Sequence, residues 1–234
     1  MLPTIKHPTY SLTIPSTNEE IEYRPFLVKE EKQLLMAAES KDSQVITKAT
    51  CDILKACILN NEIDPLELTS FDVEYIFLKI RGKSIGETIN FKVKCRECKK
   101  YTPVSVNLDD IKVDLNNCEL KKKIMITDKI GIILKPISFK NAEKLSRSKK
   151  EDILLDTICA CISSIFDENT VYDLKTLSSK EISEWIENLS RKDISEIEKF
   201  ILQLPKLRHV QEYTCIHCGV KGKLRLEGLE DFFE

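Results

Sequence analysis

Four of the nine cysteines in this 234-residue chain form two Cys-x-x-Cys pairs, Cys95 with Cys98 and Cys215 with Cys218. A two-residue gap lets both thiolates of a pair point at one metal ion, and zinc takes four such ligands in a tetrahedron. Alternating, strand-like runs enter and leave each pair, as at the hairpin tips of a zinc ribbon. The sequence therefore predicts one zinc ion held by all four cysteines.

The distance between the two pairs indicates what the metal does. There are 116 residues between Cys98 and Cys215, whereas a short-range zinc finger has a gap of roughly 12–20 residues. The ion would thus tie together two hairpins that are distant in sequence. Four thiolates leave no open coordination position, which favours a structural over a catalytic ion. Two local disulfides or four free thiols are the alternatives. His217 could replace a cysteine, but we expect it at the exposed tip of the second turn.

Composition places the chain among ordinary globular proteins. The net charge is −2, from 36 basic and 38 acidic residues, so the overall field does not attract nucleic acid. The five other cysteines show no framework spacing, and an odd total fits a reducing compartment. We see no secretory signal and no run of about 18 apolar residues, so no membrane partner is expected. With six glycines and no Gly/Ser-rich linker, we expect a single compact unit over residues 1–234.

A catalytic constellation is not evident. None of the three histidines lies near a Ser or Cys in a recognisable nucleophile motif. The stretch Arg81-Gly-Lys-Ser84 resembles the end of a phosphate-binding loop, but that motif needs a glycine where Phe77 stands. We therefore expect neither an enzyme nor a small-molecule substrate.

The pattern of apolar residues predicts an α+β fold. It is mainly helical, with an N-terminal extended hairpin and two further hairpins joined as a zinc-ribbon-like element. The expected segments are an N-terminal arm with helices (1–87), the first zinc hairpin with short strands (88–136), C-terminal helices (137–206), and the second zinc hairpin with a tail (207–234).

Local signals mark the elements within these segments. A hairpin is expected in 9–28, and helices are expected over 29–40, over 42–59 and from Ser70 to Gly82 or Gly86. Short strand-like runs cover 111–113, 123–126 and 130–134, and the apolar stripe over 153–165 predicts a helix. A capping box at Ser178 and a similar signal at Ser190 open two further helices, and Pro205 closes the second.

A partner-binding surface is expected at Tyr23, Arg24, Pro25 and Phe26. These residues combine aromatic and guanidinium groups of the kind enriched at binding hot spots. In the alternative interpretation, Phe26 and Leu27 staple the chain onto the following helix.

Two stretches resemble a known family. They are Tyr23-Arg-Pro-Phe-Leu-Val-Lys-Glu-Glu-Lys-Gln-Leu-Leu-Met-Ala, followed by Glu39-Ser, and Asp72-Val-Glu-Tyr-Ile-Phe-Leu-Lys-Ile-Arg-Gly-Lys-Ser-Ile-Gly-Glu87. With the opening Leu2-Pro3 and Pro15-Ser-Thr, they resemble the baseplate hub assembly proteins of T-even-type contractile-tailed phages. The resemblance covers roughly the first 140 residues.

This resemblance implies a non-enzymatic hub assembly factor or hub subunit that contacts other hub or tail proteins. Its place would be the host cytoplasm during assembly, or the virion tail baseplate. A zinc-ribbon protein that binds nucleic acid, with a regulatory role in the phage, is the alternative. Basic residues flank both cysteine pairs: Lys92, Lys94, Arg96, Lys99 and Lys100 in the first hairpin, and Lys221, Lys223 and Arg225 in the second.

Overall fold

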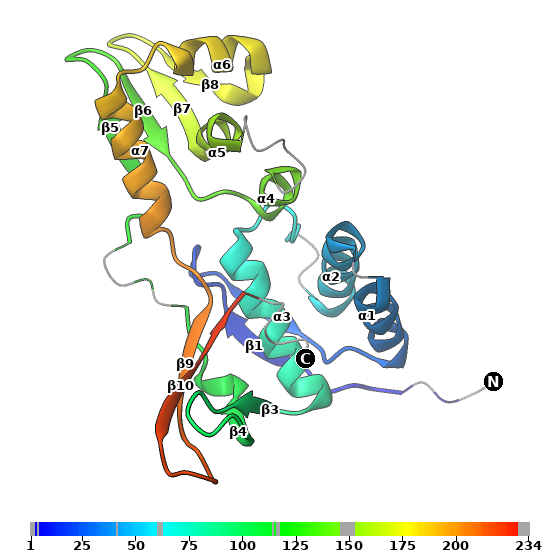
Figure 1. Cartoon of the computed structure of the whole chain (residues 1–234). Helices are drawn as coiled ribbons and strands as arrows, with labels where there is room; N and C mark the ends of the chain where they lie inside the picture. Colours follow the sequence, from blue (N-terminus) through cyan, green and yellow to red (C-terminus); the bar gives the residue numbers. More distant parts are fainter. Residues whose placement is uncertain are drawn as a thin grey trace. The chain divides into compact units, whose positions relative to one another are not determined.

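The computed structural model describes residues 3, 5–40, 42–59, 63–113, 115, 118–145 and 153–228. Leu2, which contributes to the family resemblance, lies outside these residues. The α+β class is confirmed (Figure 1).

The chain divides into two compact units, whereas the sequence suggested one. Unit 1 comprises Met1–Pro65, Phe71–Asp114 and Lys206–Glu234, and unit 2 comprises Leu66–Ser70 and Leu115–Pro205. The reason is that residues 124–200 contain a complete apolar cluster of their own.

Unit 1 is built from helices and three separate two-stranded antiparallel sheets, β1–β2, β3–β4 and β9–β10. Its elements are β1 (Tyr10–Thr13), β2 (Glu20–Tyr23), α1 (Val28–Ser40), α2 (Ser43–Cys57), α3 (Ser70–Ile85), β3 (Thr88–Lys94), β4 (Tyr101–Asn107), the 3₁₀ helix η1 (Leu108–Asp110), β9 (Arg208–Thr214) and β10 (Lys221–Glu227). The expected N-terminal hairpin and first three helices are therefore present. Of the expected strand over 111–113, only an isolated bridge between Val113 and Leu207 forms.

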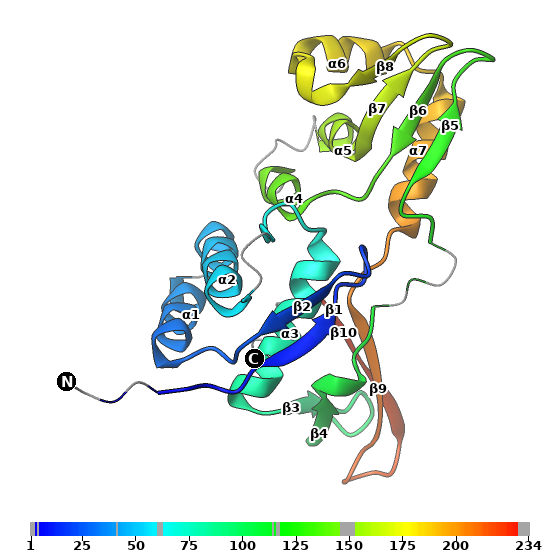
Figure 2. The same ribbon diagram turned by 180° about the vertical axis from the view of Figure 1, so that it is seen from behind.

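Helix α3 is the centre of unit 1, with buried side chains on most of its circumference. Seen from behind in Figure 2, the β1–β2 hairpin lies alongside this helix. The buried carboxylate of Asp72 accepts the backbone N–H of Ser16 at 3.0 Å, which attaches the hairpin turn to the first turn of the helix. Gly86, with φ of 143°, follows the last helical residue and lets the chain turn into β3.

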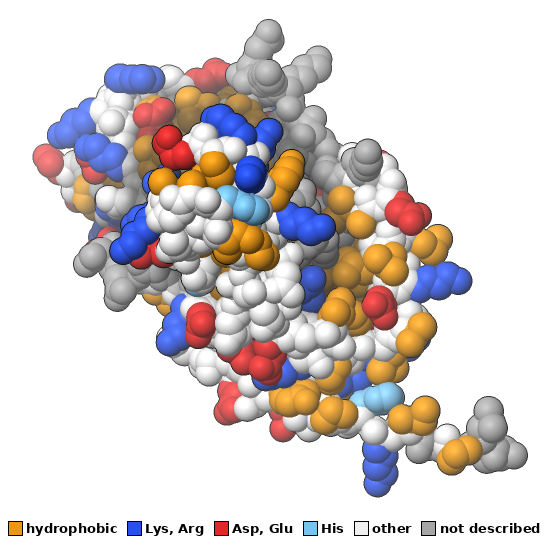
Figure 3. All heavy atoms as spheres, turned by 60° about the horizontal axis from the view of Figure 1, so that its bottom comes forward, with side chains coloured by type: hydrophobic (Ala, Val, Ile, Leu, Met, Phe, Trp, Pro, Cys, Tyr) orange, Lys and Arg blue, Asp and Glu red, His pale blue; other side chains and the backbone are white. Residues whose placement is uncertain are grey.

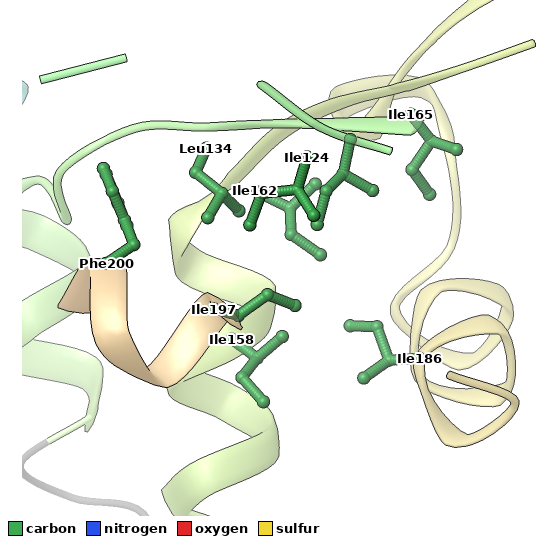
Figure 4. Packing of buried hydrophobic residues seen from close by; sticks show 9 residues of the cluster. Ile124, Leu134, Ile158, Ile162, Ile165, Ile186, Ile197 and Phe200 are labelled. Atoms are coloured by element: carbon green, nitrogen blue, oxygen red, sulfur yellow. The ribbon is translucent and has the colours of Figure 1, made fainter. Parts of the chain in front are cut away.

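Unit 2 is a four-stranded antiparallel sheet in the order β5-β6-β7-β8, with helices packed against it. Its elements are β5 (Lys122–Met125), β6 (Gly131–Leu134), α4 (Phe139–Leu145), α5 (Ile153–Cys161), β7 (Ile162–Phe166), β8 (Val171–Asp173), the 3₁₀ helix η2 (Leu174–Thr176), α6 (Ser179–Glu187) and α7 (Arg191–Gln203). Figure 4 shows strand side chains such as Ile124 and Ile162 pointing toward Ile158 and Ile197 of the helices. This cluster is the core of unit 2.

One helix prediction in unit 2 is wrong at its end. The apolar stripe over 153–165 was expected to be a single helix, but α5 ends at Cys161 and the next five residues form β7. Short apolar runs fit a buried strand as well as a helix, and here pairing with β6 decides the outcome. The helix starts are confirmed: Ser178 and Ser190 each cap a helix in a reciprocal capping box, with Glu181 and Asp193 as their partners.

Candidate metal centre

The first hairpin (β3–β4) and the second hairpin (β9–β10) end in connections of the same form. Residues 95–100 join Lys94 to its cross-strand partner Tyr101, and residues 215–220 join Thr214 to Lys221. We call these two connections the knuckles. Both are tight turns that begin with the first cysteine of a pair.

The backbone hydrogen bonds of the two knuckles correspond one to one. The N–H of Cys95 donates to the carbonyl of Lys100 at 2.9 Å, and the N–H of Lys99 donates back to Cys95 at 3.1 Å. In the second knuckle, Cys215 donates to Val220 at 2.9 Å and Gly219 donates to Cys215 at 2.9 Å. In each turn these bonds place the two thiols on the same side.

The residue after the second cysteine of each pair has a left-handed backbone. Lys99 has φ of 60° and Gly219 has φ of 73°. Glycine adopts this conformation without steric cost, whereas lysine adopts it at a cost because of its Cβ atom. The same turn forms with either residue. The geometry of the cysteine pair therefore determines the turn, and the backbone preference of the residue after the second cysteine does not.

The four sulfur atoms converge from the two hairpins. All four Sγ atoms lie within 4.8 Å of one another, with Cys95 to Cys218 at 3.7 Å and Cys98 to Cys215 at 3.6 Å. A tetrahedral site with zinc–sulfur bonds of 2.3 Å has edges of about 3.8 Å, so these separations fit four ligands around one ion. A disulfide would need about 2.05 Å, and the structure holds all four cysteines as free thiols. The cluster can therefore hold a soft metal ion.

Two polar contacts from the first hairpin reach the second knuckle. The fully buried hydroxyl of Thr102 donates to Sγ of Cys215 at 3.3 Å. Nε2 of His217 lies 3.1 Å from the carbonyl oxygen of Tyr101. His217 is exposed at the turn, as expected, and its ring joins the two hairpins instead of entering the sulfur cluster.

The sulfurs also perturb each other's ionisation. The pKa of Cys215 falls to about 5, because the Thr102 hydroxyl and then the N–H groups of His217 and Cys218 stabilise its thiolate. The Val220 N–H acts in the same direction on Cys218, but desolvation and the three neighbouring sulfurs raise the pKa of that thiol to about 12. The thiolate of Cys215 therefore forms readily and that of Cys218 does not, and a bound cation would favour the ionised form of both.

The sequence did not single out Thr102. The alternation of residues in β4 could have identified it, because Thr102 occupies an inward position together with Val104 and Val106. A hydroxyl at an inward position needs a partner, and here the partner is a cysteine sulfur.

Two of the four residues expected at a partner-binding surface are buried in unit 1, and the other two are partly exposed. Tyr23 and Phe26 are buried. The guanidinium of Arg24 donates to the carboxylate of Glu30 at 2.9 Å and to the carbonyl of Pro25 at 2.9 Å. The alternation of β2 explains the position of Tyr23, which points inward together with Ile21. This segment attaches the arm within unit 1 through its two buried aromatic rings, and a partner-binding role for the partly exposed Arg24 and Pro25 is a proposal.

Glu30 organises that attachment. Its buried carboxylate accepts the N–H of Leu27 at 2.8 Å, at the start of α1, and pairs with Arg24. Burial opposes ionisation of Glu30, but the Arg24 and Leu27 hydrogen bonds outweigh it, so its pKa lies below the ordinary value. The N–H of Phe26 donates to the Ser84 hydroxyl at 2.9 Å, which connects the segment to α3.

Residues 7–234 match the model of a family described as T4 bacteriophage base plate protein. A search of curated proteins and a search of solved structures each returned no match. In the part of the chain that the structure describes, no helix has the length and apolarity needed to cross a membrane.

Proposed function

The chain belongs to the T4 bacteriophage base plate protein family, and on this basis we propose that it is a non-enzymatic assembly factor or subunit of the baseplate hub. The observation that carries the proposal is the extent of the match, which begins at residue 7 and runs through both units. The protein would act through contacts with other hub or tail proteins. Its place would be the host cytoplasm during assembly and the baseplate of the virion tail.

The four-cysteine cluster supports a structural role for a metal in this function. We propose one zinc ion per chain, bound by Cys95, Cys98, Cys215 and Cys218, as the link between the two hairpins. Zinc accepts four thiolates in a closed tetrahedral shell, which leaves no coordination position for a substrate. The ion would stabilise the fold and so preserve the surfaces that contact other proteins.

Metal analysis of purified protein tests the zinc proposal. Protein prepared without chelator should contain one equivalent of zinc, and less than half an equivalent would contradict the proposal. Replacement of the bound ion by cobalt gives a second measurement, since tetrahedral thiolate coordination has a characteristic absorption spectrum.

The assembly role is tested with phage that carry an early stop codon in this gene. Cells infected with such phage should accumulate intact heads and lack baseplates and tails in electron micrographs. Wild-type protein supplied from a plasmid should restore tails. Normal, tailed, infectious particles without the protein would contradict the assembly role.

A further inference from the structure

Basic residues are concentrated on the two hairpins. Residues 88–107 and 208–227 together carry nine Lys or Arg and three Asp or Glu, a net charge of +6, although the whole chain has −2. A zinc ion with four thiolates contributes −2, so the metal-loaded hairpins retain about +4. In Figure 3, which brings this end of unit 1 forward, Lys and Arg side chains surround the forward lobe with hydrophobic side chains between them.

Three of these cations line one surface hollow. The hollow has a volume of about 500 Å³ and is lined by Arg96, Lys223 and Arg225. Arg96 lies inside the first knuckle, whereas Lys223 and Arg225 occupy outward positions of β10 in the second hairpin. We call this site the basic hollow.

The charges of the basic hollow are only partly compensated. Lys223 pairs with Glu212, its cross-strand neighbour, at 2.8 Å. Among the described residues, neither the Arg96 nor the Arg225 guanidinium has an ion pair. Like charges that converge on one hollow repel each other, and an anion placed between them relieves that repulsion. Guanidinium groups in addition bind carboxylates with two parallel hydrogen bonds.

We propose that the basic hollow binds acidic side chains of a partner protein in the baseplate. The choice of a protein partner rests on the proposed assembly role and on the surroundings of the hollow. Ile216 and Tyr101, at the same end of the hairpins, are 67% and 60% exposed. Arginine beside tyrosine and exposed apolar residues is typical of protein–protein interfaces. A single-stranded nucleic acid would instead need several aromatic platforms, and Tyr101 is the one Phe, Tyr or Trp of the two hairpins whose side chain is mostly exposed.

The basic hollow depends on the metal centre. Its cations come from both hairpins, and Arg96 stands between two of the metal ligands. The sulfur contacts of Cys95 with Cys218 and of Cys98 with Cys215 bring the two knuckles together, alongside the contacts of Thr102 with Cys215 and of His217 with Tyr101. Loss of the metal would separate Arg96 from Lys223 and Arg225, so binding of an acidic partner should require zinc.

The first test uses the full-length, zinc-loaded protein and a fluorescent hexaglutamate peptide. Anisotropy at about 0.1 M salt leaves short-range charge contacts unscreened. Replacing Arg96 and Arg225 together by Glu should lower affinity for the peptide at least about tenfold. Removal of zinc by a chelator should have an effect of similar size. Unchanged peptide binding in the double variant would overturn the proposal.

Two single variants serve as matched controls. Lys100→Glu reverses one charge in the same knuckle but outside the basic hollow, which is half the charge change of the double variant, and should alter affinity less than about twofold. Glu212→Gln removes the carboxylate that competes for Lys223 and should raise affinity about twofold. If each reversed charge lowers affinity by the same factor in Lys100→Glu as in the double variant, only overall charge matters, which would overturn a defined site. Each variant is first checked for zinc content and melting temperature, and Arg96→Gln with Arg225→Gln replaces the double variant if that variant does not fold.

A 20-nucleotide single-stranded DNA is the competing probe. Weak DNA binding that the double variant does not change supports the proposal. Binding of DNA tighter than that of hexaglutamate, lost in the double variant, would overturn it in favour of a nucleic-acid site.

Complementation separates this inference from the assembly role. If phage lacking the gene are tail-less and the double variant fails to restore tails, both proposals are supported. If the double variant restores tails as well as the wild type does, the acidic-partner site is wrong and the assembly role stands. If phage lacking the gene form normal tails, the assembly role fails, and the peptide measurements still decide whether the hollow binds carboxylates.

Discussion

The first and second hairpins have the same knuckle, but unit 1 supports them differently. In the first hairpin, Ile89, Val104 and Val106 are all buried, so the strands are attached to the core over most of their length. In the second hairpin, Leu226 is the one buried residue of the two strands, and Val210 is 50% exposed. Leu226 packs in the same cluster as Ile89 and Val106, near the base of the hairpins.

This difference indicates what the metal centre has to do. The first hairpin follows α3 directly and buries its own apolar face, so it can fold on unit 1 without help. The second hairpin has little apolar area to hold its outer half. The proposed zinc ion would therefore stabilise mainly the second hairpin, by fixing its knuckle to the anchored knuckle of the first.

The largest expected effect is that of removing the metal, which should loosen the second hairpin far more than the first. Structural zinc sites contribute on the order of 10 kcal/mol of binding free energy, which is coupled to folding. We expect Cys95→Ser or Cys218→Ser to lose zinc and to free the amides of β9 and β10 for hydrogen exchange, while α3 and the base of the first hairpin stay protected. Cys118→Ser, a half-buried thiol outside the cluster, should have a much smaller effect. Equal loss of protection in both hairpins would show that they do not differ in support.

Glu74→Gln should have the next largest effect. Burial raises the pKa of this α3 carboxyl to about 7, with a further contribution from Glu227, while Lys206 opposes the shift. Between the ordinary value of 4.5 and pH 7, the folded state keeps a proton that the unfolded state has released, so stability falls as pH rises. The variant should therefore be more stable than the wild type above pH 7, by on the order of 1–3 kcal/mol, and equal to it below pH 4.5.

Urea unfolding at pH 5 and pH 8 measures this effect. The comparison of variant with wild type at each pH cancels the loss of metal that acid causes in both. Glu97→Gln, at an exposed position of the first knuckle, is the control and should change stability by less than about 0.5 kcal/mol. A gain of the same size at both pH values would contradict the proposed ionisation of Glu74.

Thr102→Val tests a difference between the two hairpins at the four-cysteine cluster. The first hairpin donates the Thr102 hydroxyl to Cys215, but the corresponding position of the second is Gly222, which the ring of Tyr213 covers closely. Loss of an outer-shell hydrogen bond typically lowers metal affinity about tenfold or more. Competition with a chromophoric chelator measures the change, and Thr214→Val at an exposed position is the control. Unchanged affinity would mean that the hydroxyl is only packed near the sulfur.

The smallest expected effects come from the left-handed positions. Lys99→Gly should relieve strain and stabilise the protein by up to about 1 kcal/mol, whereas Gly219→Ala should destabilise it by about the same amount. No atom lies near enough to Gly219 to clash with an added Cβ, so backbone conformation alone is tested there. Thermal melting of both variants in excess zinc measures the two changes. Shifts of the same sign would contradict the equivalence of the two turns.

The four-cysteine cluster could be predicted from the sequence because most of its geometry is local. The Cys-x-x-Cys spacing determines each turn, and alternation in the flanking runs determines each hairpin. Capping signals at Ser178 and Ser190 likewise act within three residues, and the structure contains both capping boxes. Only the meeting of the two pairs was a long-range inference, and it followed from the four ligands that zinc requires.

The features that sequence analysis missed depend on tertiary contacts. The run after Cys161 became a strand because β6 was available to pair with it. Tyr23 and Phe26 have the chemistry of a binding hot spot, but aromatic residues are also frequent in cores, and only the fold shows which role they have. Apolar periodicity identifies buried faces without stating which core they join, so the division into two units was not visible.

The order of the segments has a consequence for synthesis on the ribosome. The first knuckle emerges with two of the four sulfurs, and Cys218 follows 120 residues after Cys98. At about 5–20 residues per second, the half-formed site waits roughly 6–24 seconds while unit 2 is translated. During that interval the nascent chain holds an exposed dithiol that can bind metal only weakly or be oxidised. The four-cysteine cluster is thus completed only after unit 2 has been translated, and if the proposed zinc ion binds there, a cell poor in zinc should accumulate chains in which the second hairpin is loose.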